Sequence, residues 1–147
     1  MADKTFRLRL VAPDRVVFDA EVQRVRVPGI DGSFGVLPGH APLMTATEPG
    51  LLLVVNDKGQ EIEMLVGDGF VEVSGQCVTI AAEAGEEAHE IDIEKAREAE
   101  KHARDLLSNR AALAEEDVLK AESELRLAAA RQFIGQRRGG SFDKGSR

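Results

Sequence analysis

The residues that break helices are concentrated before a boundary near residue 86. All five prolines lie at or before Pro49, and ten of the fourteen glycines lie at or before Gly85. From Glu86 to Ile134 there is neither glycine nor proline. Because both residue types destabilise helix interiors, long helices belong after this boundary and a different architecture before it. We predict three consecutive parts: a strand unit of residues 1–86, a helical hairpin of residues 87–134 and a terminal segment of residues 135–147.

Short runs of β-forming residues alternate in period two through the first part. Phe6, Leu8 and Leu10 share one face of the first run, while the arginines between them share the other. Turn-forming residues separate the runs, and no helical stretch is available for a parallel crossover. The pattern predicts an antiparallel β-sandwich or flattened barrel. Further runs are expected at 15–18, 22–27, 51–55, 62–66, 70–73 and 78–81.

The second part has the period of helices. Asp92 is a plausible N-cap, and apolar residues then recur every three or four positions. Ser108 and Asn109 interrupt this pattern, which resumes near Val118 and predicts a second helix antiparallel to the first. The apolar stripe is narrow and rich in alanine, so the helices can approach closely but bury little area. We therefore expect a hairpin whose helices are weakly held together.

The chain carries a net charge of −7, but its C-terminal end is cationic. Residues 125–147 contain six lysines and arginines against Asp143 alone. The overall acidity argues against binding the phosphate backbone of nucleic acids as a main role. The last thirteen residues contain four glycines and two serines and have no apolar period, which predicts a flexible basic tail over residues 135–147.

Few side chains could carry chemistry. A single cysteine, Cys77, cannot form an internal disulfide or a thiolate zinc cage, and we expect a structural thiol. His89 and His102 stand in polar stretches without converging partners, so we predict no metal site. The motifs of nucleophilic, metal-dependent and phosphate-binding enzymes are absent. The chain is therefore not expected to be an enzyme, and we assign it neither catalytic residues nor a cofactor.

Residues 29–43 form the exceptional segment of the first part. Four glycines and two prolines in this stretch impose a tightly turned backbone, and Phe34, Val36 and Leu37 can anchor it. A rigid surface loop usually presents a binding surface. The alternative is a plain strand connection in which His40 forms a local hydrogen bond.

The stretch from Gly32 to Leu43 resembles the GxxGVLPGHAPL-like segment that is characteristic of the epsilon subunit of F-type ATP synthases, called delta in mitochondria. Three later segments are similar to that family in the same order: residues 67–73 to GGFxEV with Asp68 interposed, 78–81 to VTxLA, and 91–96 to the start of its helical hairpin. The resemblance covers residues 5–134. It implies a β-sandwich of about ten antiparallel strands followed by a C-terminal antiparallel α-helical hairpin.

The resemblance also implies a function. It identifies a non-catalytic rotor subunit in the central stalk of the proton-translocating ATP synthase, which couples the gamma subunit to the c-ring and so serves ATP synthesis and proton transport. The loop residues expected to contact the c-ring or gamma are Ser33, Phe34, Val36, Leu37, His40 and Pro42. The hairpin is expected to extend toward the catalytic alpha and beta subunits and inhibit hydrolysis through Arg126, Arg131, Arg137 and Arg138.

Some members of the family bind ATP at the start of the hairpin, in a motif that here reads Ile91, Asp92, Lys95 and Ala96. Lys95 stands where the motif has an arginine, and His102 stands where a second arginine follows seven positions later. A lysine cannot grip phosphate with two parallel hydrogen bonds, and histidine is largely neutral at pH 7. We therefore expect the chain to bind ATP poorly or not at all.

The absence of a long apolar run and of a signal region at the N-terminus predicts a peripheral protein without direct membrane insertion. We expect it on the cytoplasmic face of a bacterial inner membrane, as part of the synthase. An alternative from another class is a free-standing ligand-binding β-sandwich, or a cupin-like protein, with a helical dimerisation tail. That alternative would need clustered His/Glu ligands or exposed aromatic residues on the strands, and the sequence lacks both.

Overall fold

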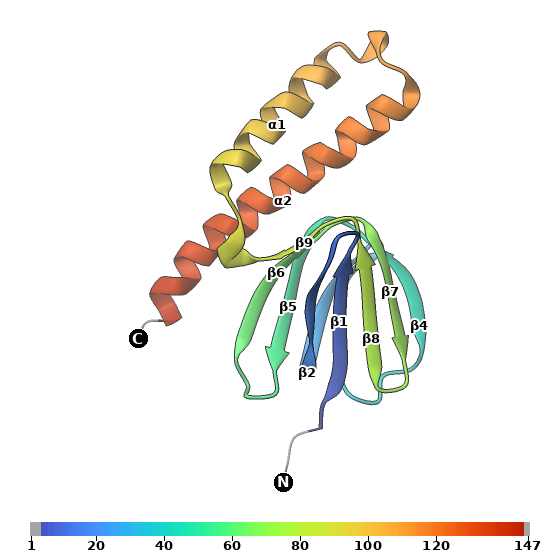
Figure 1. Cartoon of the computed structure of the whole chain (residues 1–147), viewed down its shortest axis with the longest axis vertical. Helices are drawn as coiled ribbons and strands as arrows, with labels where there is room; N and C mark the ends of the chain where they lie inside the picture. Colours follow the sequence, from blue (N-terminus) through green and yellow to red (C-terminus); the bar gives the residue numbers. More distant parts are fainter. Residues whose placement is uncertain (1–3, 146–147) are drawn as a thin grey trace. The chain divides into compact units, whose positions relative to one another are not determined.

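A computed structural model describes the backbone of residues 4–145 and the side chains of residues 4–137. The chain divides into two compact units, the first ending at Glu87 and the second beginning at Ala88 (Figure 1). The described part of the first unit consists of β1 Phe6–Ala12, β2 Arg15–Gly29, β3 Gly32–Val36, β4 Leu43–Thr47, β5 Gly50–Asn56, β6 Glu61–Val66, β7 Gly69–Ser74, β8 Cys77–Ala82 and β9 Gly85–Glu87.

The strands of the first unit are joined edge to edge and fold over into two layers (Figure 1). The hydrogen-bonded order is β1-β8-β7-β4-β2-β5-β6-β9, with β3 beside β2 and a further pairing of β1 with β2. The β-sandwich prediction is confirmed, although residues 4–145 contain nine strands rather than about ten. The expectation of purely antiparallel pairing is wrong for one pair, because β1 runs parallel to β8.

Two differences from the predicted strand runs shape the candidate site. The runs at 15–18 and 22–27 are one strand, β2, which spans both layers and shifts register between Val22 and Arg24 in its pairing with β5. The segment predicted to be a rigid loop, residues 29–43, contains strand β3 and ends at the first residue of β4. Its glycines sit in turns and at a strand edge, where they do not prevent pairing.

The core lies between the two layers and comes from the alternating apolar residues. Leu8, Leu10 and Leu52 are completely buried, as are the valines and methionine that face them. The arginines of β1 lie on the opposite face of the strand and are exposed. Burial of each large side chain contributes roughly 1.5–3 kcal/mol relative to exposure, so this core supplies the stability of a rigid unit.

The second unit contains η1 Ala88–Glu90, α1 Ile93–Ser108, η2 Arg110–Ala112 and α2 Glu115–Gly145. The Asp92 side chain accepts a hydrogen bond from the backbone N–H of Lys95, as expected of an N-cap, and α1 ends at Ser108. Four buried alanines form the seam of the hairpin: Ala96, Ala103, Ala121 and Ala128. These small side chains match the predicted narrow contact.

Helix α2 continues past Ile134, where the sequence pattern predicted the end of the hairpin, and reaches Gly145. A Cβ on Gly135 would lie 2.8 Å from Cγ1 of Ile93. This glycine therefore allows close packing against the start of α1 instead of ending the helix. The flexibility expected of residues 135–147 stays a prediction.

Candidate functional site

The segment that the sequence singled out begins with a tight hairpin between β2 and β3. Gly29 and Gly32 are paired across the two-residue turn formed by Ile30 and Asp31. Gly32 has a φ of 117°, a conformation that favours glycine. A Cβ on Gly29 would lie 2.8 Å from the ring of Phe34, so the absence of a side chain lets that ring pack over the hairpin.

A second turn follows β3 and sets the position of His40. The His40 backbone N–H donates to the carbonyl of Leu37 at 3.1 Å, and Gly39 has a φ of 84°. Proline at the second position and a positive φ at the third are the features of a type II turn. The Nδ1 atom of His40 lies 2.6 Å from the carbonyl oxygen of Ala41, so a proton on Nδ1 makes a local hydrogen bond. A local hydrogen bond of His40 is what the alternative interpretation of this segment, a plain strand connection, expects.

The predicted contact residues of this segment differ in exposure. Ser33, Leu37 and Pro42 are exposed, and Leu37 has 60% of its surface accessible. Phe34 and His40 are half-buried. Val36 is buried in the core, so it anchors the segment rather than offering a surface.

Sequence reasoning missed an apolar pair on the outer face of β4 and β7. Met44 is 67% exposed and Phe70 is 65% exposed. Met44 is paired with Glu72 and Phe70 with Ala46, which places all four on the same face. The alternation of side chains along β7 could have predicted this exposure. Val71 and Val73 face the core, so Phe70 must face outward.

The same outer face continues across β8 onto β1 and β2. In the strand register, Arg7 lies beside Cys77 and Arg9 beside Thr79. We call the surface formed by Met44, Phe70, Glu72, Thr79, Arg7, Arg9 and Asp19 the outer face.

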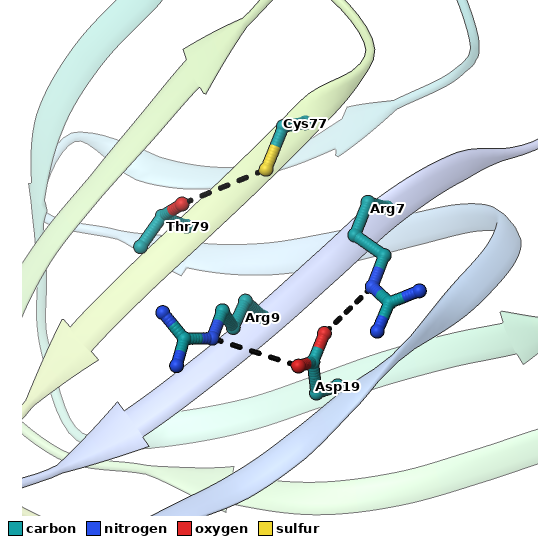
Figure 2. Close-up of polar contacts among 5 residues, drawn as sticks. All are labelled: Arg7, Arg9, Asp19, Cys77 and Thr79. Carbon is teal, nitrogen blue, oxygen red and sulfur yellow. Dashed lines mark hydrogen bonds and ion pairs between the residues drawn. The ribbon is translucent and has the colours of Figure 1, made fainter.

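Asp19 bridges the two arginines of this face. Its carboxylate lies between them (Figure 2). One carboxylate oxygen is 2.7 Å from Nε of Arg7, and the other is 3.6 Å from Nε of Arg9. The hydrogen bond from Arg7, with the attraction of both guanidinium groups, lowers the pKa of the Asp19 carboxyl. The Cys77 thiol is half-buried and lies 3.8 Å from the Thr79 hydroxyl. Glu21, the register partner of Arg7, lies on the same face, so two carboxylates and two guanidinium groups balance there.

The residues that resemble an ATP motif lie at the start of α1. Asp92 caps the helix, Lys95 is exposed and Ala96 is buried. Arg97 and Arg104, the nearest arginines, form ion pairs with Glu94 and Glu100 of their own helix. Their guanidinium groups are therefore already engaged, and weak ATP binding stays a prediction.

The two helices are joined by a polar contact as well as by the alanine seam. The Gln132 side-chain amide donates to the Glu100 carboxylate, which also accepts from Arg104. The hydrogen bond from Gln132, followed by that from Arg104, lowers the pKa of Glu100. Glu100 therefore helps to hold α2 against α1.

The basic residues expected to contact catalytic subunits lie on α2. Arg126 and Arg137 are exposed and Arg131 is half-buried, whereas the Arg138 side chain lies outside the described residues. Leu119 and Phe133 of the same helix are 61% and 60% exposed. The helix thus presents both charged and apolar side chains to solvent.

Within the described residues, no group of three or more His, Cys, Asp or Glu side chains could hold a metal ion. His89 and His102 are both exposed. No helix in the described range combines the length and apolar character needed to cross a bilayer.

Residues 5–88 match the family model described as the ATP synthase, Delta/Epsilon chain, beta-sandwich domain. The chain is 41% identical over 132 residues to an ATP synthase epsilon chain of Anaeromyxobacter sp., covering 88% of this chain and 97% of the relative. It is 40% identical over 125 residues to an ATP synthase epsilon chain of Desulforamulus reducens, covering 85% of this chain and 92% of the relative.

The fold is similar to that of a chain in the cryo-EM structure of the Euglena gracilis mitochondrial ATP synthase that includes F1 and the c-ring. The two chains share a TM-score of 0.70 with 24% sequence identity, over 86% of this chain and 78% of the other. At this identity the likeness concerns the arrangement of strands and helices.

Proposed function

The chain belongs to the family of ATP synthase delta and epsilon chains, and we propose that it serves as the rotor subunit that couples gamma to the c-ring. Chains of this family are accessory, non-catalytic subunits of the synthase complex. ATP synthesis and proton transport are therefore functions of the whole complex to which the chain contributes.

The exposed apolar pair of the outer face carries the proposal. Met44 and Phe70 lie diagonally across the paired strands β4 and β7, with Glu72 opposite Met44. The charged group of Arg7, Arg9 and Asp19 lies on the same face beyond β8. An apolar centre with a polar rim is the usual composition of a protein interface, and a few central anchors contribute most of the binding energy. Because these anchors stand on a rigid β-unit, a partner bound there would move with it. We assign the outer face to gamma.

The turn segment extends the same proposal to the membrane sector. Leu37 and Pro42 are exposed, and the type II turn over Leu37 to His40 holds Leu37 in a defined geometry. We assign Ser33, Leu37, His40 and Pro42 to contacts with the c-ring or with gamma beside it, while Phe34 and Val36 support the turn. The chain would then lie at the cytoplasmic face of a bacterial inner membrane.

Replacing Met44 and Phe70 together by glutamate is expected to weaken binding to purified gamma by more than about a hundredfold, since two central anchors each contribute roughly 2 kcal/mol or more. Biolayer interferometry with the full-length chain measures the affinity. Leu119→Glu, an equally exposed leucine of the hairpin, is the matched control and should leave gamma binding unchanged. If the double variant binds gamma with wild-type affinity, gamma does not bind the outer face.

We further propose that the hairpin regulates hydrolysis. The alanine seam is a narrow contact between α1 and α2, and the Glu100–Gln132 hydrogen bond adds a polar one, so separating the helices along the seam exposes little apolar area. Arg126, Arg131, Arg137 and Arg138 would then meet acidic surfaces of the catalytic subunits.

Reversing the charge of Arg126 and Arg137 to glutamate is expected to raise ATP hydrolysis by the reconstituted complex severalfold. Both side chains are exposed, so the helix should keep its fold. The difference from wild type should shrink as salt rises, because charges are screened over about 8–10 Å at physiological ionic strength. Lys120→Glu on the same helix is the control. Equal hydrolysis by the variant, the control and the wild type at low salt would exclude inhibition through these arginines.

A further inference from the structure

Strand β3 has a free edge beside a small pocket; the edge shares Ser33, and the pocket shares Leu37, with the contacts assigned above to the c-ring or gamma. Within residues 4–145, β3 pairs with β2 alone. The carbonyl of Pro28 accepts from the backbone N–H of Glu48 and thus points away from its register partner, Ser33. Successive residues of a strand alternate in the direction of their backbone groups. The N–H and C=O groups of Ser33 and Gly35 therefore face the open edge, where both residues are exposed.

A pocket of about 170 Å³ adjoins this edge on the outward side of β2 and β5. Leu37, Leu53 and Val55 provide apolar walls, and Arg24, Arg26 and Glu61 provide charge. Ligand sites for drug-sized molecules usually measure about 300–1,000 Å³. The pocket is thus too small for a nucleotide and suits a single side chain of a partner protein.

Two arginines make this pocket cationic. Arg24 and Arg26 are exposed, and neither has a hydrogen bond or ion pair with another described residue. Glu61 lies across the pocket beside Val55, its register partner, and so on the side away from β3. The end of the pocket nearest the free edge therefore carries Arg26 and favours a carboxylate.

Gly35 connects the free edge with the pocket. It is the register partner of Arg26, and a Cβ built on it would meet only the carbonyl oxygen of Val25, at 4.0 Å. Paired strands lie about 4.8 Å apart, so a strand added to β3 would lie about 10 Å from β2. The carboxylate would belong to the residue of the added strand that lies opposite Gly35. It can reach the long Arg26 side chain because Gly35, which lies between them, has no side chain.

We propose that the edge of β3 is a docking site for an extended acidic segment of a partner protein, which adds to β3 as a further strand. Main-chain hydrogen bonds to Ser33 and Gly35 supply the pairing, as in other cases of strand addition. An aspartate or glutamate of the partner lies opposite Gly35 and binds Arg26, with Arg24 beside it. Apolar residues flank that acid, because the neighbouring positions of β3 face the core side. The site is separate from the outer face and does not depend on its assignment to gamma.

Titration of the ¹⁵N-labelled full-length chain with the capped peptide Thr-Thr-Val-Glu-Val-Thr-Thr tests the proposal. We expect the Ser33 and Gly35 amide signals to shift, together with the Nε signals of Arg24 and Arg26. The same peptide with lysine in place of glutamate should bind at least tenfold more weakly. No shift of the Ser33 and Gly35 amides at millimolar peptide, or equal binding of the two peptides, would overturn the proposal.

Two variants test separately the contribution of the Arg26 charge and that of the backbone edge of β3. Arg26→Glu should weaken binding of the acidic peptide at least tenfold, whereas Lys101→Glu, the same charge change on exposed α1, should not alter it. Gly35→Val should also abolish binding while keeping the fold, since its Cβ meets no close atom. Broadening of the Ser33 and Gly35 signals with rising protein concentration, without peptide, would instead identify a second copy of this chain as the occupant and overturn the assignment to a partner.

Discussion

Gly69→Ala is expected to abolish the native fold of the β-sandwich. Gly69 begins β7, where it pairs with Thr47 on one side and Ala82 on the other. A Cβ at this position would lie 2.1 Å from the carbonyl oxygen of Ala81 and 2.6 Å from Cα of Ala82. Because both atoms belong to the backbone of β8, relief would require the β7–β8 pairing to open. We expect a loss of about 4 kcal/mol or more, which is exceptional for a single methyl group.

Gly35→Ala is the matched control, since it adds the same methyl group to a strand glycine with open space around it. Urea unfolding followed by circular dichroism should give a midpoint near that of wild type for the control and no folded baseline for Gly69→Ala. A cooperative transition at the wild-type midpoint in the Gly69 variant would show that β7 and β8 can separate without loss of the sandwich.

Leu52→Ala is expected to destabilise the sandwich by about 2–5 kcal/mol, the usual cost of removing a fully buried leucine side chain and leaving a cavity. Leu52 lies in the middle of β5 and is completely buried. Because the strands and helices form separate compact units, the amide signals of residues 93–108 should persist at urea concentrations that remove those of the strands.

The control for this prediction is Leu37→Ala, the same substitution at a leucine that is 60% exposed. Surface substitutions of this kind usually change stability by less than about 0.5 kcal/mol. Equal destabilisation by the two variants would contradict the location of the core. Simultaneous loss of strand and helix signals in Leu52→Ala would show that the two units unfold as one.

The local elements of this protein follow closely from its residues. The alternation of Phe6, Leu8 and Leu10 predicted a half-buried strand, and β1 has that burial pattern. The capping role of Asp92 and the break near Ser108 predicted α1 to within a residue at each end. These features depend on neighbours in sequence, since caps and periodic faces are set within one or two turns.

The candidate site was harder to predict. The turn at Leu37 to His40 follows from Pro38 and Gly39, whose conformational preferences select its type. The strands on either side of this turn were missed, because glycine lowers the strand signal even where an edge tolerates it. Phe70 was read as part of an apolar run, although its outward position follows from the burial of Val71.

Sequence alone thus determined that a strand unit is followed by two helices, the inward face of most strands and the alanine seam of the hairpin. These properties come from local propensity and from apolar periodicity. Tertiary structure decided that β1 lies parallel to β8, that β2 spans both layers, and that α2 passes Ile93 at Gly135. Each of these features depends on residues far apart in the chain. The apolar periodicity of a segment does not indicate which strand or helix it will pair with. The tertiary structure likewise placed Met44 and Phe70 at diagonal positions on one face of paired strands, and Arg26 opposite Gly35, through pairings between separate strands.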